Sequence, residues 1–208
     1  MGLRERKRQQ TRQELISAAM RLFEQKGYEP TTVAEIAAAA GVSTKTFFNY
    51  FASKDEVLFP YLSRRIDAAV NLIEQRGPDD QMSDVLVAAM QHMLADALTE
   101  EVDGGLAAVR LPMIMSVPAV QAATLHRYFL AETQLALALH RAYQDALDPA
   151  AAAAVIGSVM GAAIAAAFVC LQEGDTTDQL RVAVERAIGI AIQGVSNVEH
   201  NASRRAGD

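Results

Sequence analysis

The sequence predicts an all-α fold of about nine helices, in which a three-helix N-terminal unit is joined by a long fourth helix to a larger helical bundle. Three observations lead to this fold class. Strand patterns are nearly absent, apolar residues recur at helical spacing along the chain, and capping residues or Gly and Pro breaks recur at helix-sized intervals. The chain has 208 residues, of which 51% are hydrophobic, so one small and one medium unit can each bury a core.

Capping signals predict where four of the helices begin. Thr32 and Glu35 form one capping box and Ser53 and Glu56 form another, while Ser43, and Asp148 before Pro149, have the chemistry of single N-caps. The expected helices cover about residues 6–26, 32–39, 43–50, 55–76, 83–101, 106–115, 119–147, 149–171 and 177–197. We therefore expect a head at residues 1–54, a bundle at 55–198 and a polar, frayed tail at 199–208.

Basic residues concentrate at the N-terminal end of an acidic chain. Residues 1–56 carry a net charge of +2 and include all four lysines, whereas residues 57–208 carry a net charge of −8. Because phosphate neutralisation is a local requirement, this distribution fits a basic head that contacts a polyanion. A solvated basic run explains residues 4–12 equally well.

The cellular compartment is predicted from two features that the sequence lacks, a second cysteine and a secretory signal. Cys170 is the single cysteine, which excludes a disulfide framework within the chain and fits a reducing compartment. The charged run after Met1 has no apolar segment behind it, so no secretory signal is expected and we predict a cytoplasmic location.

One segment, residues 149–172, has no charged side chain and is long enough to span a membrane. It is dominated by alanine and carries glycine, serine and glutamine rather than a run of leucine and phenylalanine. We interpret it as a helix buried on nearly all sides inside a bundle. A membrane-associated helical adaptor remains as an alternative.

The first three expected helices have the order of a helix-turn-helix motif, with Gly41 in the turn. The second helix of such a motif lies in the major groove and directs its first side chains at base edges. Here those side chains are Thr44, Lys45 and Phe48. A helical hairpin inside a bundle would explain the apolar positions equally well. It does not explain the hydrogen-bonding rim formed by Lys45, Asn49, Tyr50 and Lys54.

Residues 32–58, TVAEIAAAAGVSTKTFFNYFASKDEVL, resemble the signature of the TetR family of transcription regulators, and residues 12–27 resemble the helix that precedes it there. The resemblance implies that the protein contacts double-stranded operator DNA, with a palindromic site read by a homodimer. It implies DNA contacts at Thr32, Ser43, Thr44, Lys45, Thr46, Phe48, Asn49, Tyr50 and Lys54. Among these, Tyr50 and Lys54 match a phosphate-contacting pair, and Phe48 can only make apolar contact, for example with a thymine methyl group.

The same resemblance implies that the last two long helices form the dimer interface as a four-helix bundle. Small residues in 149–171 allow close backbone approach, and an apolar stripe follows in 177–197. The interface residues expected on this basis are Gly157, Gly161, Ala165, Val184 and Ile188. A core within one chain is the alternative interpretation of the same pattern.

A ligand cavity is expected among the helices of residues 83–171, where methionines are frequent and aromatic residues are few. The candidate ligand-binding residues are Met90, Met93, Met113, Met115, His126, Phe129 and Phe168, although a methionine stripe at helical spacing also suits a core. The leading hypothesis is a repressor released from its operator by a small apolar ligand. A ligand-independent regulator or activator is the alternative.

The chain contains no pattern of an enzyme. The four histidines lack metal-ligand spacing with carboxylates, and Cys170 has no CxxC partner. The sequence has neither a glycine-rich phosphate loop nor a nucleophile elbow. We therefore expect no catalytic residue, no metal and no cofactor.

Overall fold

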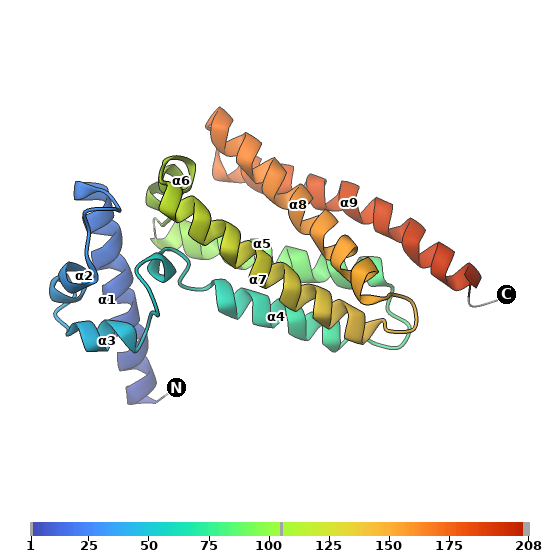
Figure 1. The fold of residues 1–208 in the computed structure, drawn as a ribbon, viewed down its shortest axis with the longest axis horizontal. Helices are drawn as coiled ribbons and strands as arrows, with labels where there is room; N and C mark the ends of the chain where they lie inside the picture. Colours follow the sequence, from blue (N-terminus) through green and yellow to red (C-terminus); the bar gives the residue numbers. More distant parts are fainter. Residues whose placement is uncertain (1, 105, 206–208) are drawn as a thin grey trace. The chain divides into compact units, whose positions relative to one another are not determined.

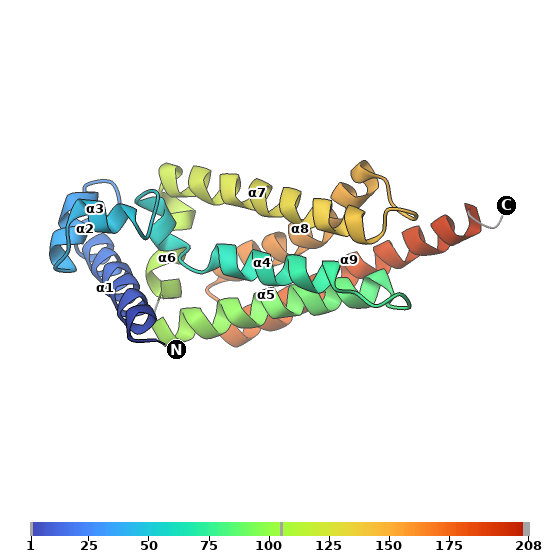
Figure 2. The same cartoon turned by 90° about the horizontal axis from the view of Figure 1, so that it is seen from below.

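The computed structural model describes residues 2–104 and 106–205, and this part of the chain contains helices and no strand (Figures 1 and 2). The elements are α1 (Leu3–Lys26), α2 (Val33–Ala39), α3 (Thr44–Phe48), the 3₁₀-helix η1 (Asp55–Leu58), α4 (Leu62–Glu74), α5 (Met82–Gly104), α6 (Leu106–Ser116), α7 (Pro118–Ala142), α8 (Pro149–Glu173) and α9 (Thr177–Arg205). The predicted all-α fold class is confirmed.

The chain folds into two compact units. The first unit, called the head unit below, comprises residues 1–62 and 101–125. The second, called the bundle unit, comprises residues 63–100 and 126–208. Helix α6 and the first turns of α7 therefore belong with the N-terminal helices, which the sequence did not suggest. The expected functional domains, 1–54 and 55–198, stay a prediction.

The head unit has a closed apolar core. On α1, Leu15, Ala19 and Phe23 are four residues apart, so they lie on one face of the helix and are buried together. The other elements of the head unit contribute Tyr28, Ile36, Ala37, Phe47, Phe51, Val57, Leu58, Met113 and Val120 to the same cluster. Figure 1 shows α2 and α3 beside α1, the arrangement expected of a helix-turn-helix motif.

The predicted long helix from 55 to 76 is wrong as a single element. It is divided into η1 and α4, with the buried Pro60 between them. Proline has no amide hydrogen to donate and disfavours helical torsion angles in the residue before it. Accordingly, Phe59 has φ −128° and ψ 51°, outside the helical region. The chain thus leaves the head unit through a break, not through a continuous helix.

Several helix ends also differ from the prediction. Helix α1 begins at Leu3, so the basic run at residues 4–8 is helical rather than an extended arm. Helix α7 ends at Ala142, after which turns bring the buried Leu147 to His140, whose Nδ1 lies 2.9 Å from the Leu147 carbonyl oxygen. Helix α9 continues to Arg205, so the expected frayed tail is helical up to that residue, while residues 206–208 lie outside the described part.

In the bundle unit, α8 and α9 pack against each other along their length (Figure 1). Helix α8 begins as predicted, with Asp148 accepting a hydrogen bond from the Ala151 amide at 2.7 Å and Pro149 in the first turn. It ends at Gly174, which has the left-handed φ of 74°.

Helix α8 is not buried on nearly all sides, contrary to the sequence-based interpretation. It is long and apolar enough to cross a membrane, and only 22% of its most apolar 18-residue window is buried within the chain. The sequence suggested burial because the helix is apolar around its whole circumference. One chain, however, covers only the face that packs on its neighbours. The rest of α8 remains available to a partner.

Candidate nucleic-acid interface

Side-chain caps fix α2 in place. Thr32 accepts a hydrogen bond from the Glu35 amide, and the Glu35 carboxylate accepts one from the Thr32 amide, so the predicted capping box is present. The same carboxylate pairs with the Lys26 ammonium on α1 at 2.6 Å. The Lys26 hydrogen bond, followed by the two from Thr32, lowers the pKa of Glu35 to about 2. Glu35 thus joins the end of α1 to the start of α2.

The turn between α2 and α3 uses a left-handed residue and a cap. Gly41 has φ 69°, a conformation that a residue with a side chain rarely adopts. Ser43 then caps α3 by accepting a hydrogen bond from the Thr46 amide at 3.0 Å. The hydroxyl groups of Ser43 and Thr46 are themselves 2.9 Å apart. The chain therefore enters α3 in a defined direction.

Helix α3 separates its two aromatic residues sharply. Phe47 is 0% exposed and lies in the core of the head unit, whereas Phe48 is 56% exposed. Their rings meet edge to face with centroids 5.5 Å apart. Thr44, Lys45 and Asn49 are exposed as well. The exposed face of α3 therefore presents a hydroxyl, an ammonium, an amide and an apolar ring, the set expected of a helix that reads base edges.

Other predicted contact residues already have partners inside the protein. The Thr32 hydroxyl donates to Glu35, and the hydroxyl groups of Ser43 and Thr46 are paired with each other. Tyr50 is half-buried at the end of the motif. These residues remain predicted contacts, since a hydroxyl group can accept or donate a second hydrogen bond.

Lys54 points into the protein rather than into open solvent. Its ammonium donates hydrogen bonds to the carbonyl oxygens of Tyr28 at 2.8 Å and Thr31 at 2.9 Å, with the Glu29 carbonyl at 3.5 Å. It also lies 4.0 Å from the centroid of the Tyr28 ring. Burial lowers the pKa of the Lys54 ammonium, against the opposing effects of nearby Glu29 and Asp55. The resemblance alone gave no sign of this arrangement.

Arg12 is a further residue of the site that the sequence analysis did not single out. Its guanidinium donates to the carbonyl oxygens of Tyr50, at 3.2 Å, and Pro60. It also lies 4.5 Å from the centroid of the Phe51 ring. The segment from Tyr50 to Pro60, called the wing loop below, is therefore tied to α1 at both ends. An arginine one helical turn before the apolar stripe of α1 was the only signal in the sequence.

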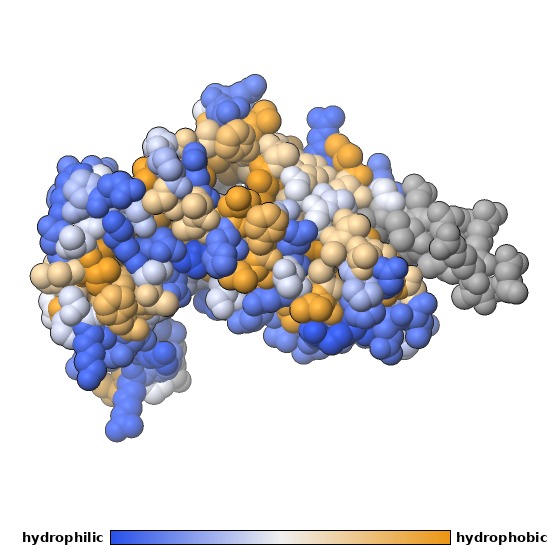
Figure 3. Space-filling model, in the orientation of Figure 1, coloured by the Kyte–Doolittle hydropathy of each residue, from blue (hydrophilic) through white to orange (hydrophobic). Residues whose placement is uncertain are grey.

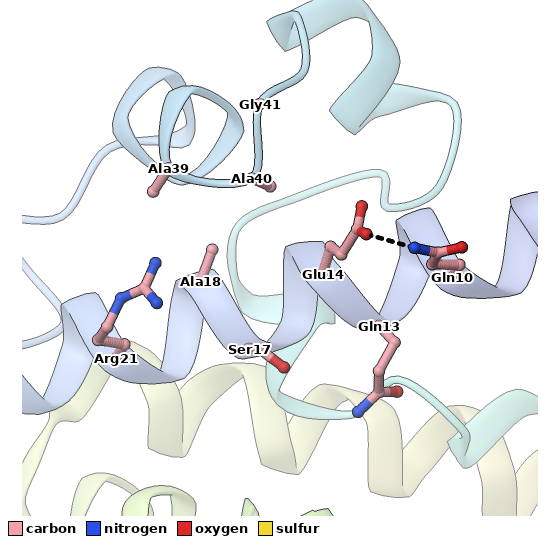
Figure 4. A pocket seen from close by; sticks show the side chains of 9 residues that line it. All are labelled: Gln10, Gln13, Glu14, Ser17, Ala18, Arg21, Ala39, Ala40 and Gly41. Carbon is pink, nitrogen blue, oxygen red and sulfur yellow. Dashed lines mark hydrogen bonds between the residues drawn. The ribbon is translucent and has the colours of Figure 1, made fainter.

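A shallow groove of about 530 Å³ runs beside α1 on the head unit (Figure 4). Its wall on α1 is polar, with Gln10 hydrogen-bonded to Glu14 and with Gln13, Ser17 and Arg21 along the same helix. Its opposite wall is formed by Ala39, Ala40 and Gly41 at the end of α2. The groove is open to solvent, and its charged side chains are exposed.

The residues predicted to bind a ligand are divided between the two units. Met113 and Met115 belong to the head unit, and Met113 is buried in its core. The other five residues belong to the bundle unit. There Met90 is buried, whereas His126, Phe129 and Phe168 are exposed. Helical spacing places methionines on a buried face, but it does not identify the core to which that face belongs.

The bundle unit has a groove of about 350 Å³ between α7 and α8. Its lining is Phe129, Glu132, Thr133, Ala136, Leu137, His140, Pro149 and Ala153, so Phe129 is the predicted ligand-binding residue that it includes. Apolar side chains dominate this lining, which also includes one carboxylate, one hydroxyl and one imidazole. The groove is the candidate ligand site of the bundle unit.

Four of the five expected interface residues contribute to packing within one chain. Val184 and Ile188 are buried on the face of α9 that packs against α8. A Cβ atom on Gly157 would lie 2.8 Å from the Glu132 carboxylate, and one on Gly161 would lie 4.0 Å from the Tyr128 hydroxyl, so both glycines face α7. The burial of Val184 and Ile188 fits the alternative interpretation, a core within the chain, while the half-buried Gly157 and Gly161 stay predicted interface residues.

Exposed apolar residues occupy the other faces of the same helices. Ala165 is exposed on α8, as expected of an interface residue. Around it lie the exposed Ile164, Phe168 and Val169, and α9 exposes Val182 and Ile190. Figure 3 shows apolar residues, in orange, along α7 and α8 on the visible side of the molecule. The chain alone does not cover this apolar surface.

Comparisons with known proteins identify the head. Residues 15–59 match the model of the family described as bacterial regulatory proteins, tetR family. The chain is 36% identical to the HTH-type transcriptional regulator TcmR of Streptomyces glaucescens over 138 residues, which cover 65% of this chain and 61% of TcmR. It is 42% identical to the regulator HbdR of Aromatoleum sp. over 59 residues, which cover 28% of this chain and 26% of HbdR. The match thus spans less than two thirds of each relative.

Solved structures agree with the fold. A TetR family transcriptional regulator from Pseudomonas syringae superimposes with a TM-score of 0.53 at 21% identity, covering 88% of this chain and 95% of the other. One from Mesorhizobium loti gives a TM-score of 0.52 at 18% identity, covering 88% and 96%. At such identities these neighbours support the fold alone. Within the described residues, no cluster of histidine, cysteine and carboxylate side chains could hold a metal ion.

Proposed function

We propose that the chain, whose residues 15–59 match the model of the tetR family, is a member of that family and a cytoplasmic, sequence-specific DNA-binding transcriptional regulator. The observation that carries the proposal is the exposed face of α3, where Thr44, Lys45 and Phe48 stand on a helix whose other face is locked into the core by Phe47. A recognition helix needs this division, because readout requires side chains held in a fixed register.

The test is a titration of the protein with the DNA that flanks its own gene, compared with random DNA of equal length. Specific binding should weaken linearly on a plot of log affinity against log salt concentration. Replacing Lys45 by Met should reduce the steepness of this dependence or change the preferred base, and replacing Thr44 by Ala should change preference. Equal affinity for flanking and random DNA at every salt concentration would contradict the proposal.

We propose that the protein binds DNA as a homodimer formed through the exposed apolar faces of α8 and α9. Two observations support this proposal. Helix α8 is largely uncovered within one chain, and a soluble protein rarely leaves a contiguous apolar face in water. A two-fold symmetric pair also presents two copies of α3 to a palindromic site. The residues that carry the contact are Ile164, Ala165, Phe168, Val169, Val182 and Ile190 rather than the buried stripe of α9.

We further propose that the protein is a repressor released by a small apolar ligand, which occupies the groove between α7 and α8 or a site that opens near it. The largely apolar lining of the groove, which also includes Glu132 and His140, supports this class of ligand. Helices α5 and α7 each continue from one unit into the other, whereas the connection at Pro60 is broken. We therefore propose that α5 and α7 transmit the effect of a bound ligand to the head unit and so lower its affinity for the operator.

A thermal-shift screen of apolar metabolites and drugs tests the ligand proposal. Each compound that raises the melting temperature is then added to an operator-binding titration. Operator affinity should fall by about 5–150-fold, and ligand affinity should fall by the same factor when operator is present. Compounds that stabilise the protein and leave operator affinity unchanged would favour the alternative, a ligand-independent regulator or activator.

A further inference from the structure

We propose that Lys54 is a positioning residue that locks the wing loop to the connection between α1 and α2, and that it is not the phosphate contact that its place in the family pattern implies. The proposal rests on the proposed function, because it concerns the DNA-binding head. It changes what a substitution at this position should do to DNA binding.

The first argument is the number of acceptors around the ammonium. A lysine ammonium has three donors, and three backbone carbonyl oxygens, of Tyr28, Glu29 and Thr31, lie 2.8–3.5 Å from Lys54 Nζ. These carbonyl groups belong to residues 27–32, where the chain leaves one helix and enters the next. Lys54 therefore supplies donors to an irregular backbone segment, in which the Tyr28 carbonyl also accepts from the Thr31 amide at 3.2 Å.

The second argument is the surroundings of the ammonium. The Tyr28 ring lies 4.0 Å from Nζ and is itself buried against Phe23, with ring centroids 5.2 Å apart. The Thr31 side chain is also buried, and its hydroxyl donates to the Gly27 carbonyl at 2.8 Å. The cation thus lies over a fixed ring on a fixed turn. A phosphate contact would require it to leave both.

The third argument is the place of Lys54 in the wing loop. Arg12 ties Tyr50 and Pro60, at the two ends of this loop, to α1. Lys54 lies between these ends and ties the loop to the residues that follow α1. Two cations thus hold the loop at three positions. Tyr50, at one end of the loop, is placed for DNA through them.

The salt dependence of DNA binding separates a lock from a phosphate contact. Replacing Lys54 by Met keeps the length of the side chain and removes its donors. Because no phosphate contact is lost, the slope of log affinity against log salt should equal that of the wild type. The melting temperature should fall by roughly 5–10 °C, since the carbonyl groups of Glu29 and Thr31 lose the Lys54 donor and that of Tyr28 keeps only the Thr31 amide. The affinity for DNA should still fall at every salt concentration, because the wing loop is no longer held in place.

Lys45→Met is the matched control, because Lys45 is exposed on α3. In a dimer the loss of this exposed cation from each half-site should reduce the slope, by up to about 1.8 where each ammonium neutralises one phosphate, and leave the melting temperature unchanged. A slope reduced equally by Lys54→Met would overturn the proposal, whatever happens to its melting temperature.

A third variant covers the case in which Lys54→Met does not fold. Lys54→Arg keeps the charge, but a planar guanidinium cannot direct donors at three carbonyl oxygens arranged around one point. For Lys54→Arg we expect the wild-type slope of log affinity against log salt and a lowered melting temperature. An unchanged melting temperature would contradict the proposed positioning role of Lys54. The melting temperatures are measured without DNA, so they test the lock even if no operator is found and the proposed function fails.

Discussion

The head unit and the α8–α9 pair use their apolar residues in opposite ways. The head unit places Phe47 and Phe51 in a closed core and ties its loops to that core with Arg12 and Lys54. The α8–α9 pair buries one face and leaves Phe168 and other large apolar side chains in water. A unit that is complete by itself can present a rigid surface, whereas an incomplete one requires a partner. This difference supports the proposal that the first region recognises DNA and that the second associates with a partner.

The largest expected effect comes from adding a charge to the uncovered face. Phe168→Glu buries a carboxylate without a partner in the proposed interface, which costs about 3–5 kcal/mol per buried charge. The dimer should dissociate at micromolar concentration in sedimentation experiments, and operator affinity should fall at least ~100-fold. The control is Leu137→Glu, at an equally exposed apolar position on α7. A dimer that survives Phe168→Glu but not Leu137→Glu would move the interface to α7.

The next effect concerns the two adjacent phenylalanines of α3. Phe47→Ala removes a ring that is fully buried in the head unit, so it should lower the free energy of unfolding by about 3–5 kcal/mol. Phe48→Ala removes an exposed ring, so it should change stability by less than ~0.5 kcal/mol and weaken specific DNA binding. Calorimetry and operator titrations measure the two effects. Equal destabilisation by both variants would show that α3 has no free face.

A smaller effect tests where the glycines of α8 face. A Cβ atom on Gly161 meets nothing closer than the Tyr128 hydroxyl at 4.0 Å, so Gly161→Ala should stabilise the helix by about 0.5–1 kcal/mol. At Gly157 the Glu132 side chain must first move, so Gly157→Ala should gain less. Neither substitution should change the dimer dissociation constant. A higher dimer dissociation constant for either variant would indicate that these glycines lie in the interface between chains.

The smallest effect is the acid response of Glu35 in the head unit. Its pKa is lowered from 4.5 to about 2, so the carboxylate stabilises the fold above about pH 4.5, and this contribution is lost as the pH falls toward about 2. The melting temperature of wild type should exceed that of Glu35→Gln at neutral pH. The difference should vanish between about pH 4.5 and about pH 2. A difference that persists at the acid end would assign the stabilisation to something other than the ionised carboxylate.

The sequence by itself determined most of the helices, several of their caps and the helix-turn-helix motif. The capping box expected at Ser53 and Glu56 is absent, because η1 begins after Lys54 without a side-chain cap and Glu56 accepts from the Ala52 amide. Thr32, Ser43 and Asp148 act on amides within their own helical turn, so spacing along the chain is sufficient to predict them. Pro60 is equally visible in the sequence, but the apolar periodicity of residues 55–76 continues across it and predicts one helix, so periodicity does not reveal the break. Local chemistry thus fixed the elements and their order.

Only the tertiary structure decided which neighbour each face meets. Periodicity shows that Val184 and Ile188 share a face of α9, but it does not show whether α8 of the same chain or a second chain covers that face. In the same way, the family pattern places Lys54 beside DNA, whereas the turn at residues 27–32 directs its carbonyl groups at the ammonium. The direction of a carbonyl group depends on how distant segments meet, and spacing along the chain does not encode it.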